Sequence, residues 1–322
     1  MAPPRQWPAP STIVTPPSDT PRPVELRSTT CAICGDGESA SLLYAQSFDA
    51  SDLNPVLFSA RRAPDRRHFR IVRCDKCGLV RSDPVATSAT LAGLYADSAF
   101  DYSDEVENLR RTYRRYLCRL ERLGASKEGL LEIGCGNGFF LAEALANGFT
   151  NVRGVEPSTD AIQKSSPEIR PLIAQGVMRP GLYAEGQFGV VCLFQVFDHL
   201  PDPRSLLVES RRILRPGGLM LFFNHNVEAF SARLLGERSP IIDIEHTYLY
   251  SPATMAQILK RTGFEVIAGG VAMNSYSTRY LAHLLPLPGA LKVVLGRLLS
   301  GPAGRVRMTV PLGNLYVVAR RS

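Results

Sequence analysis

Short apolar runs alternate with amphipathic segments through the second half of the chain. The runs predict strands, whereas the segments between them repeat apolar positions at helical spacing. The predicted strands cover residues 129–134, 152–156, 170–174, 188–194, 218–224, 264–272 and 314–320. The predicted helices cover residues 138–147, 158–165, 203–215 and 252–262. Alternating strands and helices are typical of a parallel sheet with crossover helices, so we expect an α/β domain over residues 128–322.

The first 127 residues divide into three segments of different composition. Residues 1–28 predict a disordered leader, because eight of the first thirty residues are proline and no apolar run typical of a secretory signal is present. Residues 29–84 hold four of the seven cysteines and predict a compact module. Residues 85–127 predict a helical linker or lid, with helices over 88–95 and 104–123.

The charge of the chain leaves several partners open. A net charge of +7 and a pI near 9.1 permit nucleic acid, anionic lipid or phosphorylated substrates. Arginines crowd residues 61–73, and a second group over 110–122 is interleaved with glutamates, which is typical of a solvated helix face. The most apolar stretch, 280–299, is broken by prolines and charges and predicts no bilayer span, so we expect a cytoplasmic protein with reduced thiols. The basic, leucine-rich segment 279–307 predicts a cap over a substrate pocket, or alternatively a peripheral membrane contact.

A glycine-rich turn carries the first candidate chemistry. The apolar run ends in Gly134-Cys135-Gly136-Asn137-Gly138, and the next predicted strand ends in Glu156. Glycines let a ligand approach the backbone closely, and a carboxylate at Glu156 can accept both hydroxyls of a ribose. The spacing differs from that of dinucleotide sites, and Glu132 before the turn would repel a pyrophosphate. S-adenosylmethionine (SAM) fits, because it carries a ribose, a sulfonium and an ammonium but no phosphate.

At these residues the chain resembles the class I SAM-dependent methyltransferases. Residues 188–200 resemble their fourth strand and the loop that follows, and residues 213–219 resemble the turn into their fifth strand. The resemblance implies a Rossmann-like seven-stranded sheet over residues 128–322. It also implies that cofactor-binding positions are Glu132, Gly134, Cys135, Gly136, Gly138, Glu156 and Gln195.

Two Cys-x-x-Cys-Gly sequences predict a metal site in the N-terminal module. The four cysteines are Cys31, Cys34, Cys74 and Cys77. Four thiolates suit a closed, structural Zn²⁺ site, although the 39 residues between the pairs exceed a usual zinc-ribbon gap and imply an insertion. The alternatives are four unlinked buried cysteines or, less favoured, a redox pair. The module resembles the zinc-binding head of bacterial methyltransferases of sugar, polysaccharide and secondary-metabolite pathways.

Three polar segments are candidates for the acceptor side of the reaction, where a base must remove a proton. Asp198-His199 follows the fourth predicted strand, and His199 is either the base or a structural residue. Glu245-His246 matches a pair that zinc-headed sugar C-methyltransferases place beside the substrate, which favours His246 as base or substrate anchor. Residues 224–226 (Asn-His-Asn) could contact the substrate, but strand-end hydrogen bonding is the preferred interpretation. The sugar C-methyltransferases carry a further C-terminal domain that this sequence does not match, which favours O-methylation.

The function predicted from the sequence is therefore SAM-dependent methyl transfer to a small, carbohydrate-like acceptor. A nucleic-acid methyltransferase is the second hypothesis, with the zinc module and the arginines holding RNA or DNA. The sequence Gln195-Val196-Phe197-Asp198 disfavours it, because base-flipping amine methylases carry an Asn/Asp-Pro-Pro-aromatic sequence there. A non-catalytic SAM-binding scaffold is the third hypothesis, and the intact glycine turn disfavours it.

Overall fold

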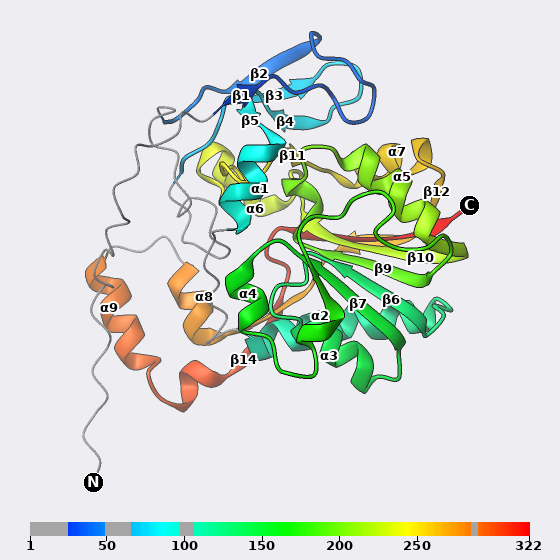
Figure 1. Ribbon diagram of the computed structural model, residues 1–322. Coiled ribbons are helices and arrows are strands. Elements are labelled where there is room, and N and C mark those ends of the chain that lie inside the picture. Colours follow the sequence, from blue (N-terminus) through cyan, green and yellow to red (C-terminus); the bar gives the residue numbers. More distant parts are fainter. Residues whose placement is uncertain (1–24, 49–65, 97–105, 285–288) are drawn as a thin grey trace, which may run out of the picture.

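A seven-stranded mixed sheet forms the centre of the computed structural model, which describes residues 25–48, 66–96, 106–284 and 289–322 (Figure 1). The strands, in sheet order, are β12 (Phe264–Val271), β15 (Asn314–Arg321), β10 (Leu214–His225), β9 (Phe188–Phe194), β6 (Glu128–Ile133), β7 (Thr150–Glu156) and β8 (Ile173–Gln175). Strands β10, β9, β6, β7 and β8 are parallel, and β15 is antiparallel to both of its neighbours. This is the Rossmann-like methyltransferase architecture that the sequence predicts.

Helices cover both faces of this sheet (Figure 1). The helices are α2 (Val106–Arg122), α3 (Phe139–Ala146), α4 (Thr159–Gln163), α5 (Pro203–Ile213) and α7 (Pro252–Arg261). Apolar residues of α5 and α7 join one buried cluster, and those of α2 and α3 join another. Adjacent residues of β6 alternate between the clusters, since Leu130 joins the second and Leu131 the first.

Side-chain caps fix the starts of α5 and α7. The Asp202 carboxylate accepts a hydrogen bond from the Ser205 amide, which caps α5, and Ser251 and Thr254 form a capping box at the start of α7. Each of the two helices also begins with proline, whose missing amide hydrogen costs nothing at that position. These residues thus set where α5 begins after β9 and where α7 begins after β11.

The cysteine module forms a second sheet that is completed by the α/β domain. Its strands, in sheet order, are β11 (Tyr248–Leu249), β4 (Val80–Ser82), β3 (Ile71–Cys74) and β2 (Ala40–Tyr44), while β1 (Leu26–Arg27) pairs with β5 (Val85–Ala86). Strand β11 pairs antiparallel with β4, with Tyr248 opposite Arg81. Ile33 and Leu79 of the module join the same buried cluster as Met255 of α7. The module therefore packs on the α7 side of the central sheet (Figure 1).

The remaining elements are helical or short. They are α1 (Ser88–Ala96), α6 (Phe230–Leu235), α8 (Thr278–Leu284), α9 (Gly289–Leu298) and the antiparallel pair β13 (Asn274–Ser277) and β14 (Arg307–Val310). The strand predicted over 170–174 is wrong in its first half, because Arg170–Leu172 forms a 3₁₀ turn around Pro171 and only Ile173–Gln175 is a strand. Most of the predicted leader and part of the arginine-rich stretch 61–73 lie outside the described residues. Within the described ranges, no helix has the length and apolar character needed to cross a bilayer.

Candidate active site

The glycine turn lies directly against the loop that follows β9. Gly134 has a φ of 73°, in the left-handed region that favours glycine. A Cβ atom added to Gly134 would lie 2.4 Å from Cγ2 of Val196. The turn and the loop after β9 are therefore in van der Waals contact at the carboxyl edge of the sheet, where open α/β sheets bind their ligands.

Glu156 ties this turn to the end of β7. Its Oε2 accepts a 2.8 Å hydrogen bond from the Gly136 amide, and its Oε1 accepts one of 2.8 Å from the Ser158 amide. The side chain is buried, and burial raises the pKa of the Glu156 carboxyl. Each carboxylate oxygen has a second lone pair, so the ribose-binding role expected of Glu156 is compatible with these bonds.

Glu132 is a buried carboxyl group with an oxygen that lacks a partner. Only 2% of the residue is exposed, and Oε2 accepts no hydrogen bond from the described residues. Burial, and secondarily the nearby Glu156 charge, raise the pKa of Glu132 well above its usual value. A buried acceptor of this kind fits a ligand that carries an ammonium group, as SAM does.

Two further predicted cofactor positions have distinct surroundings. Gln195 has a φ of 56°, and its amide donates a 2.6 Å hydrogen bond to the Phe223 carbonyl. A non-glycine residue in this backbone region at a ligand edge is typical of functional loops. Cys135 is buried with its sulfur next to Gly154, and burial raises the pKa of this thiol well above its usual value. The Cys135 side chain therefore packs within the turn.

An aspartate surrounded by three imidazoles follows β9. Asp198 has no exposed surface, and its Oδ2 accepts a 2.7 Å hydrogen bond from Nδ1 of His225 at the end of β10. His246 Nε2 lies 4.0 Å from the same oxygen, and His199 Nε2 lies 3.7 Å from Oδ1. The His246 ring centroid is 4.8 Å from that of His199 and 4.6 Å from that of His225. We call these four residues the Asp198 cluster.

The electrostatics keep the imidazoles of His199 and His246 neutral and the Asp198 carboxylate ionised. Burial lowers the pKa of His246, and burial lowers the pKa of His199 to about 3. Burial opposes ionisation of Asp198, but the hydrogen bond from His225 and the surrounding imidazoles hold the pKa of this carboxyl well below its usual range. The cluster therefore presents nitrogen and oxygen lone pairs to a ligand.

The structure brings residues of all three predicted polar segments together. His199 and His246 lie in one cluster, and His246 Nδ1 takes the Ile241 carbonyl as its partner, at 2.8 Å, rather than the adjacent Glu245 carboxylate. Glu245 is half-buried, and its amide donates to Asp243 Oδ1. His225, at the end of β10, donates a hydrogen bond from Nδ1 to the Asp198 side chain.

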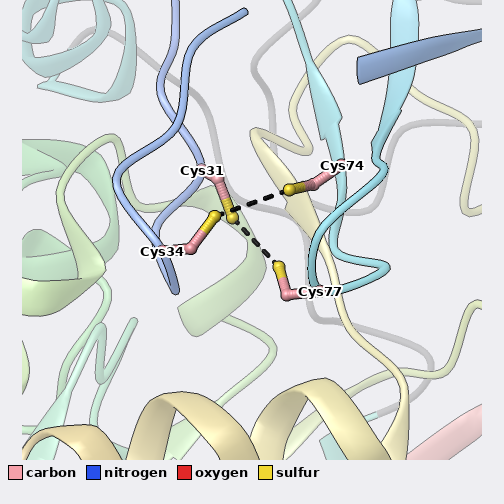
Figure 2. A group of neighbouring side chains, drawn as sticks. All are labelled: Cys31, Cys34, Cys74 and Cys77. Atoms are coloured by element: carbon pink, nitrogen blue, oxygen red, sulfur yellow. Dashed lines mark hydrogen bonds between the residues drawn. The ribbon is translucent and has the colours of Figure 1, made fainter. Parts of the chain in front are cut away.

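The four cysteines of the N-terminal module converge on one point (Figure 2). Their sulfur atoms all lie within 4.8 Å of one another, with Cys31 and Cys77 sulfurs 3.2 Å apart and Cys34 and Cys74 sulfurs 3.5 Å apart. Four thiolates around Zn²⁺ are separated by about 3.8 Å, given Zn–S bonds of about 2.3 Å in a tetrahedron. The donor set and spacing thus fit a structural zinc ion.

The cysteine module also holds the backbone beside His246. The Ser82 hydroxyl donates a 2.7 Å hydrogen bond to the His246 carbonyl, and the Ser82 amide donates one of 2.9 Å to the Thr247 carbonyl. On the other side, the Thr247 amide donates to the Asp198 carbonyl at 2.9 Å. A continuous chain of hydrogen bonds therefore connects the module to the Asp198 cluster.

The sheet topology, the glycine turn and the two buried carboxylates define a SAM-dependent methyltransferase. Comparison with known families agrees: the Methyltransferase domain model matches residues 106–268, about half of the chain, and the protein belongs to this family. The ubiquinone biosynthesis O-methyltransferase of Cupriavidus pinatubonensis is 26% identical over 171 residues, covering 49% of this chain and 68% of the relative. That of Thiobacillus denitrificans is 27% identical over 149 residues, covering 42% and 64%.

Solved methyltransferase structures are also similar. A putative methyltransferase from Bacillus halodurans has 19% identity and a TM-score of 0.46, covering 64% of this chain and 98% of that protein. A putative Haloferax volcanii methyltransferase, solved with the Trm112 activator, has 17% identity and a TM-score of 0.46, covering 68% and 94%.

Proposed function

We propose that this protein transfers the methyl group of SAM to a hydroxyl oxygen of a small, carbohydrate-like molecule. One observation carries the proposal: Asp198 and its cluster lie close to the glycine turn, because Asp198 follows Val196 by two residues and Val196 packs against that turn. Groups that can bind a hydroxyl and accept its proton therefore lie beside the place where class I methyltransferases hold their cofactor.

The cofactor side is assigned to the turn and its two carboxylates. Glu156 would accept the ribose hydroxyls, and Glu132 would face the ammonium group, whose charge would return Glu132 to its ionised form. When bound, SAM supplies a methyl group already activated on a sulfonium.

On the acceptor side, His199 is proposed as the base. The acceptor oxygen forms a bond to the methyl carbon as the carbon–sulfur bond breaks, S-adenosylhomocysteine leaves, and the hydroxyl proton passes to His199 Nε2. His199 Nδ1 lies 3.0 Å from the Tyr95 hydroxyl. When Nδ1 carries the proton and donates it to that oxygen, Nε2 carries no proton and can accept one. A weakly basic imidazole suffices, because the oxygen becomes strongly acidic as its new bond forms. Asp198 would stabilise the imidazolium.

Two considerations support a small acceptor with a hydroxyl group. The relatives from Cupriavidus pinatubonensis and Thiobacillus denitrificans are named as O-methyltransferases of ubiquinone biosynthesis. The cysteine module resembles the heads of methyltransferases of sugar and secondary-metabolite pathways, which favours the carbohydrate-like acceptor. We also propose that the four cysteines hold Zn²⁺ as a structural ion.

The first test is calorimetric titration of zinc-analysed protein with SAM, with Glu156→Ala as the comparison. Micromolar binding that is lost in the variant is the expected result. A panel of nucleotide sugars, glycosides and catechols is then assayed for release of S-adenosylhomocysteine. Turnover of a sugar supports the full proposal, and turnover of catechols alone overturns its carbohydrate part. A folded, zinc-loaded protein that binds no SAM, or that methylates only RNA, overturns the proposal.

A further inference from the structure

The Asp198 cluster has more acceptor atoms than protons to satisfy them. Asp198 is fully buried, yet its Oδ1 has no hydrogen-bond partner among the described residues. Its Oδ2 accepts a 2.7 Å hydrogen bond from the His225 ring and a longer one, of 3.4 Å, from the His225 amide. A buried carboxylate oxygen without a partner is unfavourable, so its retention calls for a ligand.

The His246 ring also has a nitrogen that faces Asp198. Its Nδ1 donates a proton to the Ile241 carbonyl, which leaves an unprotonated Nε2 that faces Asp198 Oδ2 across 4.0 Å. At this distance no hydrogen bond joins the two atoms. An imidazole held by a backbone carbonyl on one nitrogen and free on the other is the usual state of a metal-ligating histidine.

Ion pairing gives a second argument. The ion pairs that Asp198 makes with described residues are all with histidines, and none is with a lysine or an arginine of that part of the chain. A buried carboxylate requires a compensating positive charge. The ligand atoms of Asp198, His225 and His246 lie within 4.8 Å of one another, close enough to share one cation.

We infer that Asp198, His225 and His246 form a binding site for a divalent transition-metal ion, separate from the cysteine cluster. Two imidazoles and one carboxylate favour Zn²⁺, Fe²⁺ or Co²⁺ over Mg²⁺ or Ca²⁺, which prefer oxygen ligands. His225 presents Nδ1 to the metal once its proton moves to Nε2. Three protein ligands leave coordination positions open.

The open positions suggest what the metal does, and this role rests on the proposed function. An acceptor hydroxyl bound to the metal becomes more acidic, so His199, which lies outside the ligand set, can accept its proton more readily. The acceptor class is then one that offers an oxygen ligand, such as a sugar hydroxyl.

Cobalt titration tests the metal site directly. Protein whose cysteine cluster is already filled with zinc is titrated with Co²⁺, and visible absorption distinguishes nitrogen- and oxygen-ligated cobalt from thiolate-ligated cobalt. We expect one further Co²⁺ per chain without thiolate bands. Asp198→Asn and His246→Gln should each weaken binding at least tenfold, whereas His199→Gln should change it less than threefold.

The controls separate the metal site from the methyl-transfer proposal. Retained SAM binding shows that each variant is folded, and His199→Gln should lose methyl transfer while it keeps Co²⁺. A wild-type protein that binds SAM but takes up no cobalt beyond the cysteine cluster would overturn the metal site and leave methyl transfer standing. Equal cobalt affinity in all three variants would also overturn it.

Discussion

Glu132→Gln should make the stability of the ligand-free protein less sensitive to rising pH. Below the usual carboxyl pKa of 4.5, Glu132 is protonated in both the folded and the unfolded chain. Above that pH the unfolded chain releases the proton, while the folded protein keeps it because burial raises the pKa of Glu132. The free energy of unfolding therefore falls by about 1.4 kcal/mol per pH unit until the raised pKa is reached. Glutamine cannot ionise and removes this loss.

The size of the effect follows from the direction and extent of that pKa shift. Between pH 5 and pH 8 the variant should therefore gain about 1.4 kcal/mol on the wild type for each pH unit that lies below the raised pKa of Glu132. Any fixed cost of packing an amide at this position is independent of pH and cancels in the comparison. Urea unfolding followed by circular dichroism, at intervals across that range, measures the difference.

Glu128→Gln is the matched control on the same strand. Its side chain is 74% exposed and pairs with Arg215 at 2.7 Å, so its loss should change stability by less than about 1 kcal/mol. Wild type and both variants share the cysteine cluster, whose own pH dependence therefore cancels. A flat difference between Glu132→Gln and wild type would refute the reasoning, because Glu132 would then ionise as easily in the folded protein as in the unfolded chain. Glu132→Gln should also bind SAM about ten- to a hundredfold more weakly, since the charged hydrogen bond between the Glu132 carboxylate and the SAM ammonium is lost.

Three other perturbations have expected outcomes. Gly134→Ala should weaken SAM binding at least tenfold in calorimetry, whereas Gly217→Ala should not; both have a φ of 73°, but an added Cβ clashes only at Gly134, so equal effects would contradict the role of the close contact. Ser82→Ala leaves the buried carbonyl two residues before β11 without its side-chain donor, at a cost of about 1–3 kcal/mol, and should speed hydrogen exchange in β11; unchanged exchange would argue against the coupling. Cys34→Ser should release zinc and lower the melting temperature by more than about 5 °C, while Cys118→Ser, outside the cluster, should do neither.

The sequence predicts the sheet and the cofactor turn well because both depend on local patterns. Apolar runs fix the strands to within a few residues, and the spacing of glycines around Gly134 is itself the turn. The exception is the run at Arg170, where Pro171 replaces the first half of a strand with a 3₁₀ turn. Local patterns thus succeed for the other six strands of the central sheet.

The Asp198 cluster is only partly predictable, because it is assembled from segments far apart in the chain. Asp198 and His225 are 27 residues apart and meet because β9 and β10 are parallel neighbours, with Phe194 opposite Phe223. Knowledge of that register would have paired them, since both follow the carboxyl ends of their strands. The two-residue strand β11 leaves no periodicity to detect, and so its pairing with the cysteine module has no signal in the sequence.

The pairing of β11 with β4 limits how the protein can evolve. Strand β11 belongs to the α/β domain in sequence but to the cysteine module in hydrogen bonding. A cysteine module exchanged for that of a relative would therefore need an edge strand that pairs with β11. It would also need an equivalent of Ser82 that donates to the His246 carbonyl. Residues 80–82 and 246–249 should accordingly covary among relatives, and the head and the domain should be inherited as a single unit.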